Sequence, residues 1–117
     1  MDDELNHLWK EIYNDPNLFY IVIDDGEKLI STCTLAIIKN LTRNARPYGL
    51  IENVVTHPEY RNQGNGTRVL QKAVEICREN NCYKVMLLTG SKEETTLNFY
   101  EKAGFDREAK TGFYRRL

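Results

Sequence analysis

The chain has 117 residues, of which 41% are hydrophobic and 28% charged, so we expect residues 1–117 to form one globular domain around a single core. The formal net charge of −1 gives no basic surface, which argues against nucleic acid as the primary partner. No apolar run approaches membrane-spanning length, and the polar start Met1-Asp2-Asp3-Glu4 is unlike a signal peptide, so no membrane partner is expected.

The few cysteines and histidines point away from disulfide and metal chemistry. Cys33, Cys77 and Cys82 are odd in number and form no C-x-x-C pair, which is typical of reduced thiols in a cytoplasmic protein. His7 and His57 do not belong to a metal-ligand cluster, so we expect no metal.

Hydrophobic periodicity predicts helices and strands in alternation along the chain. The Asp15-Pro16-Asn17 run ends the first helix, and Asp25-Gly26 is typical of a hairpin turn. A polar loop is predicted at 40–47, and a final strand or hairpin from Phe105 onward with a turn near residues 110–112. The predicted helices are 3–14, 64–79 and 93–103, and the predicted strands are 18–24, 28–39, 48–56 and 83–89.

The order of these elements predicts an α/β fold with a mixed sheet. The strand–helix–strand–helix run over 48–103 implies parallel pairing through a right-handed crossover. The flanking hairpins imply antiparallel pairing. We therefore expect helices on both faces of one mixed sheet.

The segment after the strand at 48–56 has the pattern of a diphosphate-binding loop. Arg61 and two glycines, Gly64 and Gly66, precede an amphipathic helix whose first N–H groups can bind phosphate oxygens. A Walker A loop is excluded because no lysine follows Gly66. A dinucleotide fingerprint is excluded because Val69 stands where its third glycine belongs.

The pattern Arg61-x-x-Gly64-x-Gly66, preceded by Val-Val-Thr-His-Pro-Glu-Tyr, resembles the acyl-CoA pyrophosphate loop of the GNAT superfamily of N-acetyltransferases. The block Asn-Phe-Tyr-Glu-Lys-Ala-Gly-Phe at 98–105 resembles the "FYEKxGF" segment of the same superfamily. The resemblance covers roughly residues 18–117 and implies the GNAT acyl-CoA N-acyltransferase fold. Three segments together further resemble glucosamine-6-phosphate N-acetyltransferases, although those enzymes favour an acidic residue where Asn53 stands. These segments are Ile-Glu-Asn-Val-Val at 51–55, Cys-Tyr-Lys-Val-Met at 82–86 and Phe-Tyr-Glu-Lys at 99–102.

The resemblance implies acetyl-CoA as co-substrate. The end of the 48–56 strand is expected to separate from its parallel neighbour and to pair with pantetheine through backbone groups. The implied cofactor-binding residues are Val54, Val55, Thr56, Arg61, Asn62, Gln63, Gly64, Asn65, Gly66 and Thr67.

Two residues are candidates for acid–base catalysis. Tyr100 has a phenol suited to reprotonating a departing thiolate, and the superfamily places this tyrosine beside the CoA sulfur; the alternative is a core aromatic. Glu52 interrupts an apolar strand, and we expect it half-buried on the face shared by Leu50, Val54 and Thr56. It is either the base that deprotonates the amine or an ion-paired structural carboxylate.

Three further positions receive no catalytic role. Glu93 stands where many superfamily members carry a cofactor-binding asparagine, so that contact is not assigned. His57 precedes a proline in a turn and is expected at the surface. Cys33 and Cys82 are expected to be inert thiols, which argues against a covalent acyl-enzyme.

The expected function is direct transfer of an acetyl group to a primary amine of a small molecule or peptide, with an oxyanion met by a strand N–H near Val54. Members of the superfamily usually begin with one further strand and helix, which this chain lacks. The rivals are therefore a non-catalytic acyl-CoA-binding or regulatory module, and a fragment or truncated, inactive form of a longer acetyltransferase. The expected open edge at 18–24 also predicts a homodimer.

Overall fold

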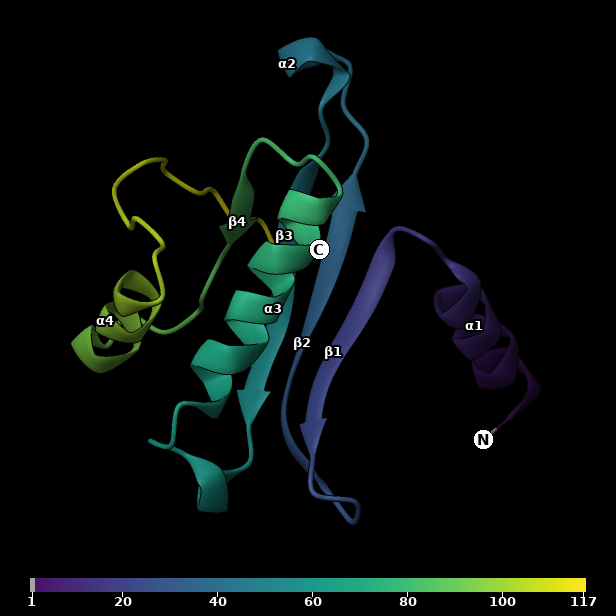
Figure 1. Cartoon of the computed structure of the whole chain (residues 1–117), viewed down its shortest axis with the longest axis vertical. Helices are drawn as coiled ribbons and strands as arrows, with labels where there is room; N and C mark the ends of the chain where they lie inside the picture. The colour runs from purple at the N-terminus through teal and green to yellow at the C-terminus, as the bar shows by residue number, and fades with distance from the viewer. Residues whose placement is uncertain (1) are drawn as a thin grey trace.

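The computed structural model describes residues 2–117 (Figure 1). Its helices are α1 Asp3–Asn14, α2 Thr42–Ala45, α3 Asn65–Glu79 and α4 Glu94–Lys102, and a 3₁₀ turn, η1, spans Pro58–Tyr60. Its strands are β1 Leu18–Asp24, β2 Leu29–Ile38, β3 Tyr48–Thr56 and β4 Val85–Leu87. The predicted helices and the first three predicted strands are therefore confirmed to within one residue at each end. β4 is shorter than predicted, and the final strand predicted from Phe105 onward does not form.

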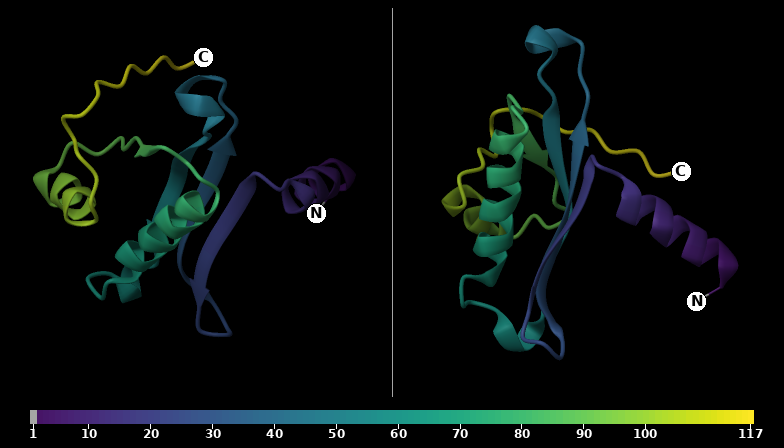
Figure 2. Two further views of the ribbon diagram at one scale, coloured as in Figure 1. Left: turned by 45° about the horizontal axis from the view of Figure 1, so that its top comes forward. Right: turned by 45° about the vertical axis from the view of Figure 1, so that its right-hand side comes forward.

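The strands form one mixed sheet in the order β1-β2-β3-β4. β1, β2 and β3 pair antiparallel, and β4 pairs parallel to β3, as the sequence predicts. α3 covers one face of the sheet, while α1 lies on the other side next to β1 (Figure 2). The contact of α1 with the sheet includes Trp9, whose ring centroid lies 6.5 Å from that of Tyr20.

The core lies between α3 and the sheet, because β2 turns alternate side chains toward the helix. Helix α3 meets them with the apolar stripe that the sequence predicts. The buried apolar residues are Cys33, Leu35, Ile37, Ile51, Val69, Leu70, Ala73 and Cys77. This packing fixes α3 on β2 and β3. It also fixes the N-terminus of α3, which the loop after β3 leads into.

The crossover helix α3 and the later helix α4 both end within one residue of the predicted positions. After α3, Asn81 adopts a left-handed φ of 60°, and the N–H of Cys82 donates to Cys77 O at 2.9 Å. After α4, Gly104 has φ of 101°, and the N–H of Phe105 donates to Tyr100 O at 3.0 Å. These caps satisfy the last carbonyls of each helix.

Of two predictions about irregular segments, one is confirmed and one is wrong. The predicted loop at 40–47 is confirmed, because α2 within it has positive φ at Arg43, Asn44 and Ala45 and is a left-handed turn, not a regular helix. The predicted final strand does not form: residues 106–117 are exposed and carry no strand. β4 offers only Val85–Leu87 for pairing with a further strand, so few ladder hydrogen bonds could form.

Among residues 2–117, no helix combines the length and apolar character that crossing a membrane requires.

Candidate active site

β3 and β4 pair at one end only, which leaves a gap in the sheet. Their parallel register runs from Gly49 opposite Val85 to Ile51 opposite Leu87. β3 continues to Thr56, and beyond Ile51 its recorded partner is β2 alone. The last part of β3 therefore presents an unpaired edge toward the space that β4 leaves, which is the separation that the family resemblance implies.

A β-bulge in β3 controls the direction of its side chains. Thr34 faces Glu52 and Thr32 faces Val55, so Asn53 and Val54 together lie opposite Cys33. Asn53 accommodates the extra residue with φ of 55°. The bulge reverses the alternation of faces along β3.

The predicted shared face of Leu50, Glu52, Val54 and Thr56 is therefore wrong. Thr56 pairs with buried Ser31 on the α3 side, whereas Glu52 pairs with Thr34 on the opposite face. The expected half-burial of Glu52 is also wrong, because its side chain is exposed. The bulge is the physical reason, since one extra residue inverts a period of two.

The backbone groups of β3 divide between β2 and the gap. The N–H of His57 donates to Ile30 O at 2.7 Å, so the neighbouring Thr56 points its own N–H and C=O away from β2. By the same alternation Val54 also points toward the gap. Val55 points toward β2, where its carbonyl accepts from Ser31 Oγ at 3.1 Å. Of the three predicted strand residues, Val54 thus presents both its N–H and its C=O toward the gap, and Thr56 presents its N–H, since the Thr56 carbonyl accepts from Arg61 Nε.

The loop between η1 and α3 gathers unbonded N–H groups. Asn62 and Gly64 have φ of 62° and 83°, which turns the chain sharply into the helix. Within residues 2–117, no backbone N–H from Arg61 to Thr67 donates to a protein acceptor. Gly64 caps α3 without a side-chain bond, and the first turn holds no acidic residue. This is the arrangement that the positive end of a helix offers to an anion.

Two side chains of this loop form hydrogen bonds that stabilise it, and others remain exposed. Arg61 Nε donates to Thr56 O at 3.4 Å, and Asn65 Nδ2 donates to Tyr60 O at 3.3 Å. Asn62 and Gln63 are exposed, and Thr67 is half-buried. The loop is therefore fixed to the end of β3 through Arg61 while its N–H groups remain free.

Gly66 lies against α4. A Cβ built on Gly66 would lie 2.9 Å from Cζ of Phe99 and 3.4 Å from Oγ1 of Thr56. The sequence indicates a glycine that admits a phosphate. The structure adds a second cause, because the Phe99 ring occupies the space that a side chain would need.

Tyr100 lies on the α3 side, packed against the core. Burial, and secondarily the nearby Cys33 thiol, raise the pKa of its phenol above the ordinary value of 10.0. Tyr100 therefore keeps its proton at neutral pH, as a general acid must. It lies on the opposite face of the sheet from Glu52.

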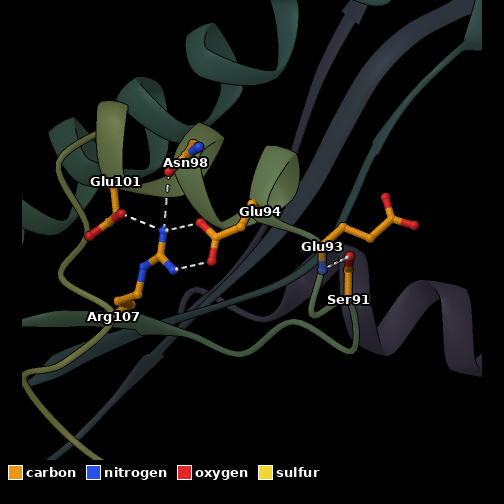
Figure 3. Close-up of polar contacts among 6 residues, drawn as sticks. All are labelled: Ser91, Glu93, Glu94, Asn98, Glu101 and Arg107. Carbon is orange, nitrogen blue, oxygen red and sulfur yellow. Dashed lines mark hydrogen bonds and ion pairs between the residues drawn. The ribbon is translucent and has the colours of Figure 1, made fainter.

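Arg107 holds α4 to the segment that follows it (Figure 3). Its guanidinium bonds Glu94 at 3.1 Å, Asn98 at 3.2 Å and Glu101 at 2.6 Å, so it spans two turns of the helix. The carboxylates beside Arg107 raise its pKa further above its usual range. Glu93 lies outside this cluster, and its side chain points away from Arg107 in Figure 3.

The cysteines are unsuited to nucleophilic chemistry. Burial raises the pKa of the Cys33 thiol to about 11 and that of the Cys77 thiol to about 12. Burial also raises the pKa of Cys82. The prediction of inert thiols is therefore supported, because a protonated thiol is a poor nucleophile. His57 is half-buried and its Nδ1 accepts from the N–H of Glu59 at 3.2 Å, so it serves the η1 turn.

Three residues near the site were not predicted. Phe99 lies in the motif at 98–105, but its contact with Gly66 joins two elements that only the fold brings together. Arg107 gave no sequence signal. Ser31 gave a signal, since it is a polar residue in the buried register of Cys33, Leu35 and Ile37. In the part of the chain that the structure describes, no group of three His, Cys, Asp or Glu side chains is placed to hold a metal.

Comparison with known proteins identifies relatives with the same fold. Glucosamine 6-phosphate N-acetyltransferase of Trypanosoma brucei brucei is 40% identical over 78 residues, which cover 67% of this chain and 51% of the relative. This chain thus spans about half the length of that protein. A solved structure from Agrobacterium tumefaciens str. C58 superposes with a TM-score of 0.91 at 42% identity, covering 100% of this chain and 81% of the other.

Glucosamine-6-phosphate N-acetyltransferase from Arabidopsis thaliana superposes with a TM-score of 0.82 at 27% identity, covering 98% of this chain and 78% of that structure. The family model described as the acetyltransferase (GNAT) family matches residues 1–105. This match takes in the β3 strand, the anion loop and the helix of Tyr100. The chain belongs to the acetyltransferase (GNAT) family.

Proposed function

We propose that this chain binds acetyl-CoA and transfers its acetyl group directly to a primary amine. The observation that carries the proposal is the gap between β3 and β4, which opens beside a loop of unbonded N–H groups. Acetyl-CoA has a diphosphate and an extended chain with two amides, and these two features match the loop and the free edge of β3. Family membership supports the same reaction.

The binding residues follow from this arrangement. Arg61 to Thr67 would hold the diphosphate by their N–H groups, helped by the exposed Arg61 guanidinium. The N–H and C=O of Val54 and the N–H of Thr56 would pair with the pantetheine amides as a neighbouring strand does. The N–H of Val54 would stabilise the negative charge that develops on the thioester oxygen.

Tyr100 and Glu52 fit the two proton transfers from opposite faces of the sheet. Glu52 would remove a proton from the incoming ammonium, directly or through water, so that the nitrogen can form the new C–N bond. Tyr100 would donate its proton to the sulfur as the C–S bond breaks, and would regain one from solvent. The products are the N-acetylated amine and free CoA thiol.

The acceptor class is proposed from the relatives. Two of them carry glucosamine 6-phosphate N-acetyltransferase as their name, so an amino-sugar phosphate is the first acceptor to test. A peptide N-terminus is the alternative. We also propose a cytoplasmic, reducing setting, which the free thiols of Cys33, Cys77 and Cys82 favour.

Acetyl-CoA at about 100 times its Kd is expected to raise the melting temperature by roughly 10 °C, because ligand binding at that excess stabilises a chain of this size by about 2.7 kcal/mol. NAD and ATP at the same concentration are expected to shift it much less. Thiol release is then measured with glucosamine 6-phosphate, glucosamine, a peptide and a no-amine control.

The outcomes separate the candidate functions. Thiol release that depends on one amine supports the transferase. Binding of acetyl-CoA without release for any amine would favour the non-catalytic acyl-CoA-binding module. Equal, weak shifts with all three nucleotides would remove the basis of the proposal.

We propose in addition that the chain forms a homodimer. β1 lies at the edge of the sheet, and Leu8 and Trp9 of α1 are each 50% exposed. An open strand edge and an exposed apolar helix face favour association. Light scattering is expected to give twice the chain mass of 13.7 kDa. A mass of 13.7 kDa at every concentration would contradict it.

A further inference from the structure

Ser31 of β2 is a polar side chain in an apolar environment. Its exposed fraction is 1%, and it is the one polar residue that is buried within residues 2–117. It shares the α3-facing register of β2 with Cys33 and Leu35, where every other buried side chain is apolar. A buried hydroxyl is costly unless it is hydrogen-bonded, so its partners define its role.

Both partners of Ser31 lie at the end of β3. Its Oγ donates to Val55 O at 3.1 Å and lies 2.9 Å from Oγ1 of Thr56. A serine hydroxyl has one hydrogen, and a carbonyl can only accept. When Ser31 gives its hydrogen to Val55 O, the Thr56 hydroxyl is the donor to Ser31 Oγ. Both bonds then form together and join Ser31 to two consecutive residues of β3.

Thr56 connects the strand to the anion loop. Its carbonyl accepts from Arg61 Nε at 3.4 Å, and its Oγ1 lies 3.4 Å from the position of a Cβ on Gly66. Beyond the bulge, β3 has no β4 partner, so β2 is the strand that supports this segment. If the backbone of Thr56 turned about the strand axis, its N–H would no longer face the gap. Its carbonyl would also shift, and with it the loop that Arg61 attaches there.

We propose that Ser31 is a positioning residue for acetyl-CoA binding: its hydroxyl fixes the orientation of Val55 and Thr56, and so aligns the free edge of β3 with the N–H groups of the loop. The inference rests on the proposed function, because it names what aligns that site. Ser31 is covered by the protein and acts through Thr56.

The test is Ser31→Ala, measured by calorimetry with acetyl-CoA and by steady-state kinetics. The Kd and KM for acetyl-CoA are expected to rise about tenfold, while kcat at saturation and the KM for the amine change less than threefold. A loss confined to one substrate is not expected from general destabilisation.

Two further variants control the result. Ile37→Val removes one buried methyl group at the other end of β2, so it should lower the melting temperature without changing the affinity for acetyl-CoA. Thr56→Val removes the other hydroxyl of the Ser31–Thr56 pair and should raise the Kd for acetyl-CoA similarly. The double variant Ser31→Ala/Thr56→Val should lose no more than the larger single change, because both remove one bridge.

An unchanged Kd in Ser31→Ala or in Thr56→Val overturns the inference while leaving the proposed function in place. An equal rise in Ile37→Val also overturns it, since the effect would then follow from stability. A wild-type chain that binds no acetyl-CoA overturns the proposed function and the inference together.

Discussion

Replacement of Tyr100 by phenylalanine is expected to lower kcat by roughly 10²- to 10⁴-fold, the span for loss of a general acid, with acetyl-CoA affinity preserved. The phenol is held on the α3 face, and its pKa is raised by burial and by Cys33, with no hydrogen bond contributing. The variant should therefore lose no protein contact, and its melting temperature should match that of the wild type.

The pH dependence provides an independent check on Tyr100. Because its pKa is raised above 10.0, the acid form persists through neutral pH and is lost only as pH rises through that higher value. The wild-type rate should fall on this basic side, and the phenylalanine variant should lack that fall. An unchanged kcat with a good amine would show that Tyr100 only packs in the core.

Gly66→Val is expected to abolish measurable acetyl-CoA binding. Its Cβ would meet the end of the Phe99 ring at 2.9 Å and Thr56 Oγ1 at 3.4 Å, in the first turn of the helix whose N–H groups face the anion. Calorimetry measures the loss, and circular dichroism checks that the fold remains. Wild-type affinity in a folded variant would exclude Gly66 from the site.

Two variants separate the causes of that loss. Gly64→Ala meets no atom within 4 Å but must adopt φ of 83°, so it should cost about 1 kcal/mol of stability without a collision. Phe99→Leu combined with Gly66→Ala relieves the contact with the ring. If affinity returns in this pair, the glycine serves packing against α4; if it stays lost, the glycine admits the ligand.

The sequence was informative wherever local rules act alone. Gly104 and Asn81 follow their helices at positive φ, which both residue types favour, and the helix ends predicted from the sequence lie within one residue of those observed. The tail after Phe105 had apolar residues typical of a strand, but strand formation depends on the length of a partner edge, and β4 is short.

The candidate site was predicted less completely, for reasons that lie in tertiary structure. The loop from Arg61 to Thr67 was recognisable because its chemistry resides in consecutive residues. The face on which Glu52 lies could not be predicted, because an asparagine at position 53 does not by itself indicate a β-bulge. Ser31 was readable as a polar residue in a buried register, yet its partners become visible only when β3 is placed beside it.

The bulge at Asn53 also bears on how chains of this kind should be aligned. A relative aligned with a one-residue gap at this position cannot keep both Gly49 and Thr56 in their places against β2. Either the residues before the gap or those after it would turn their side chains to the opposite face and their backbone groups to the opposite edge. A change of one residue in length here therefore alters the strand more than replacement of any single side chain in it.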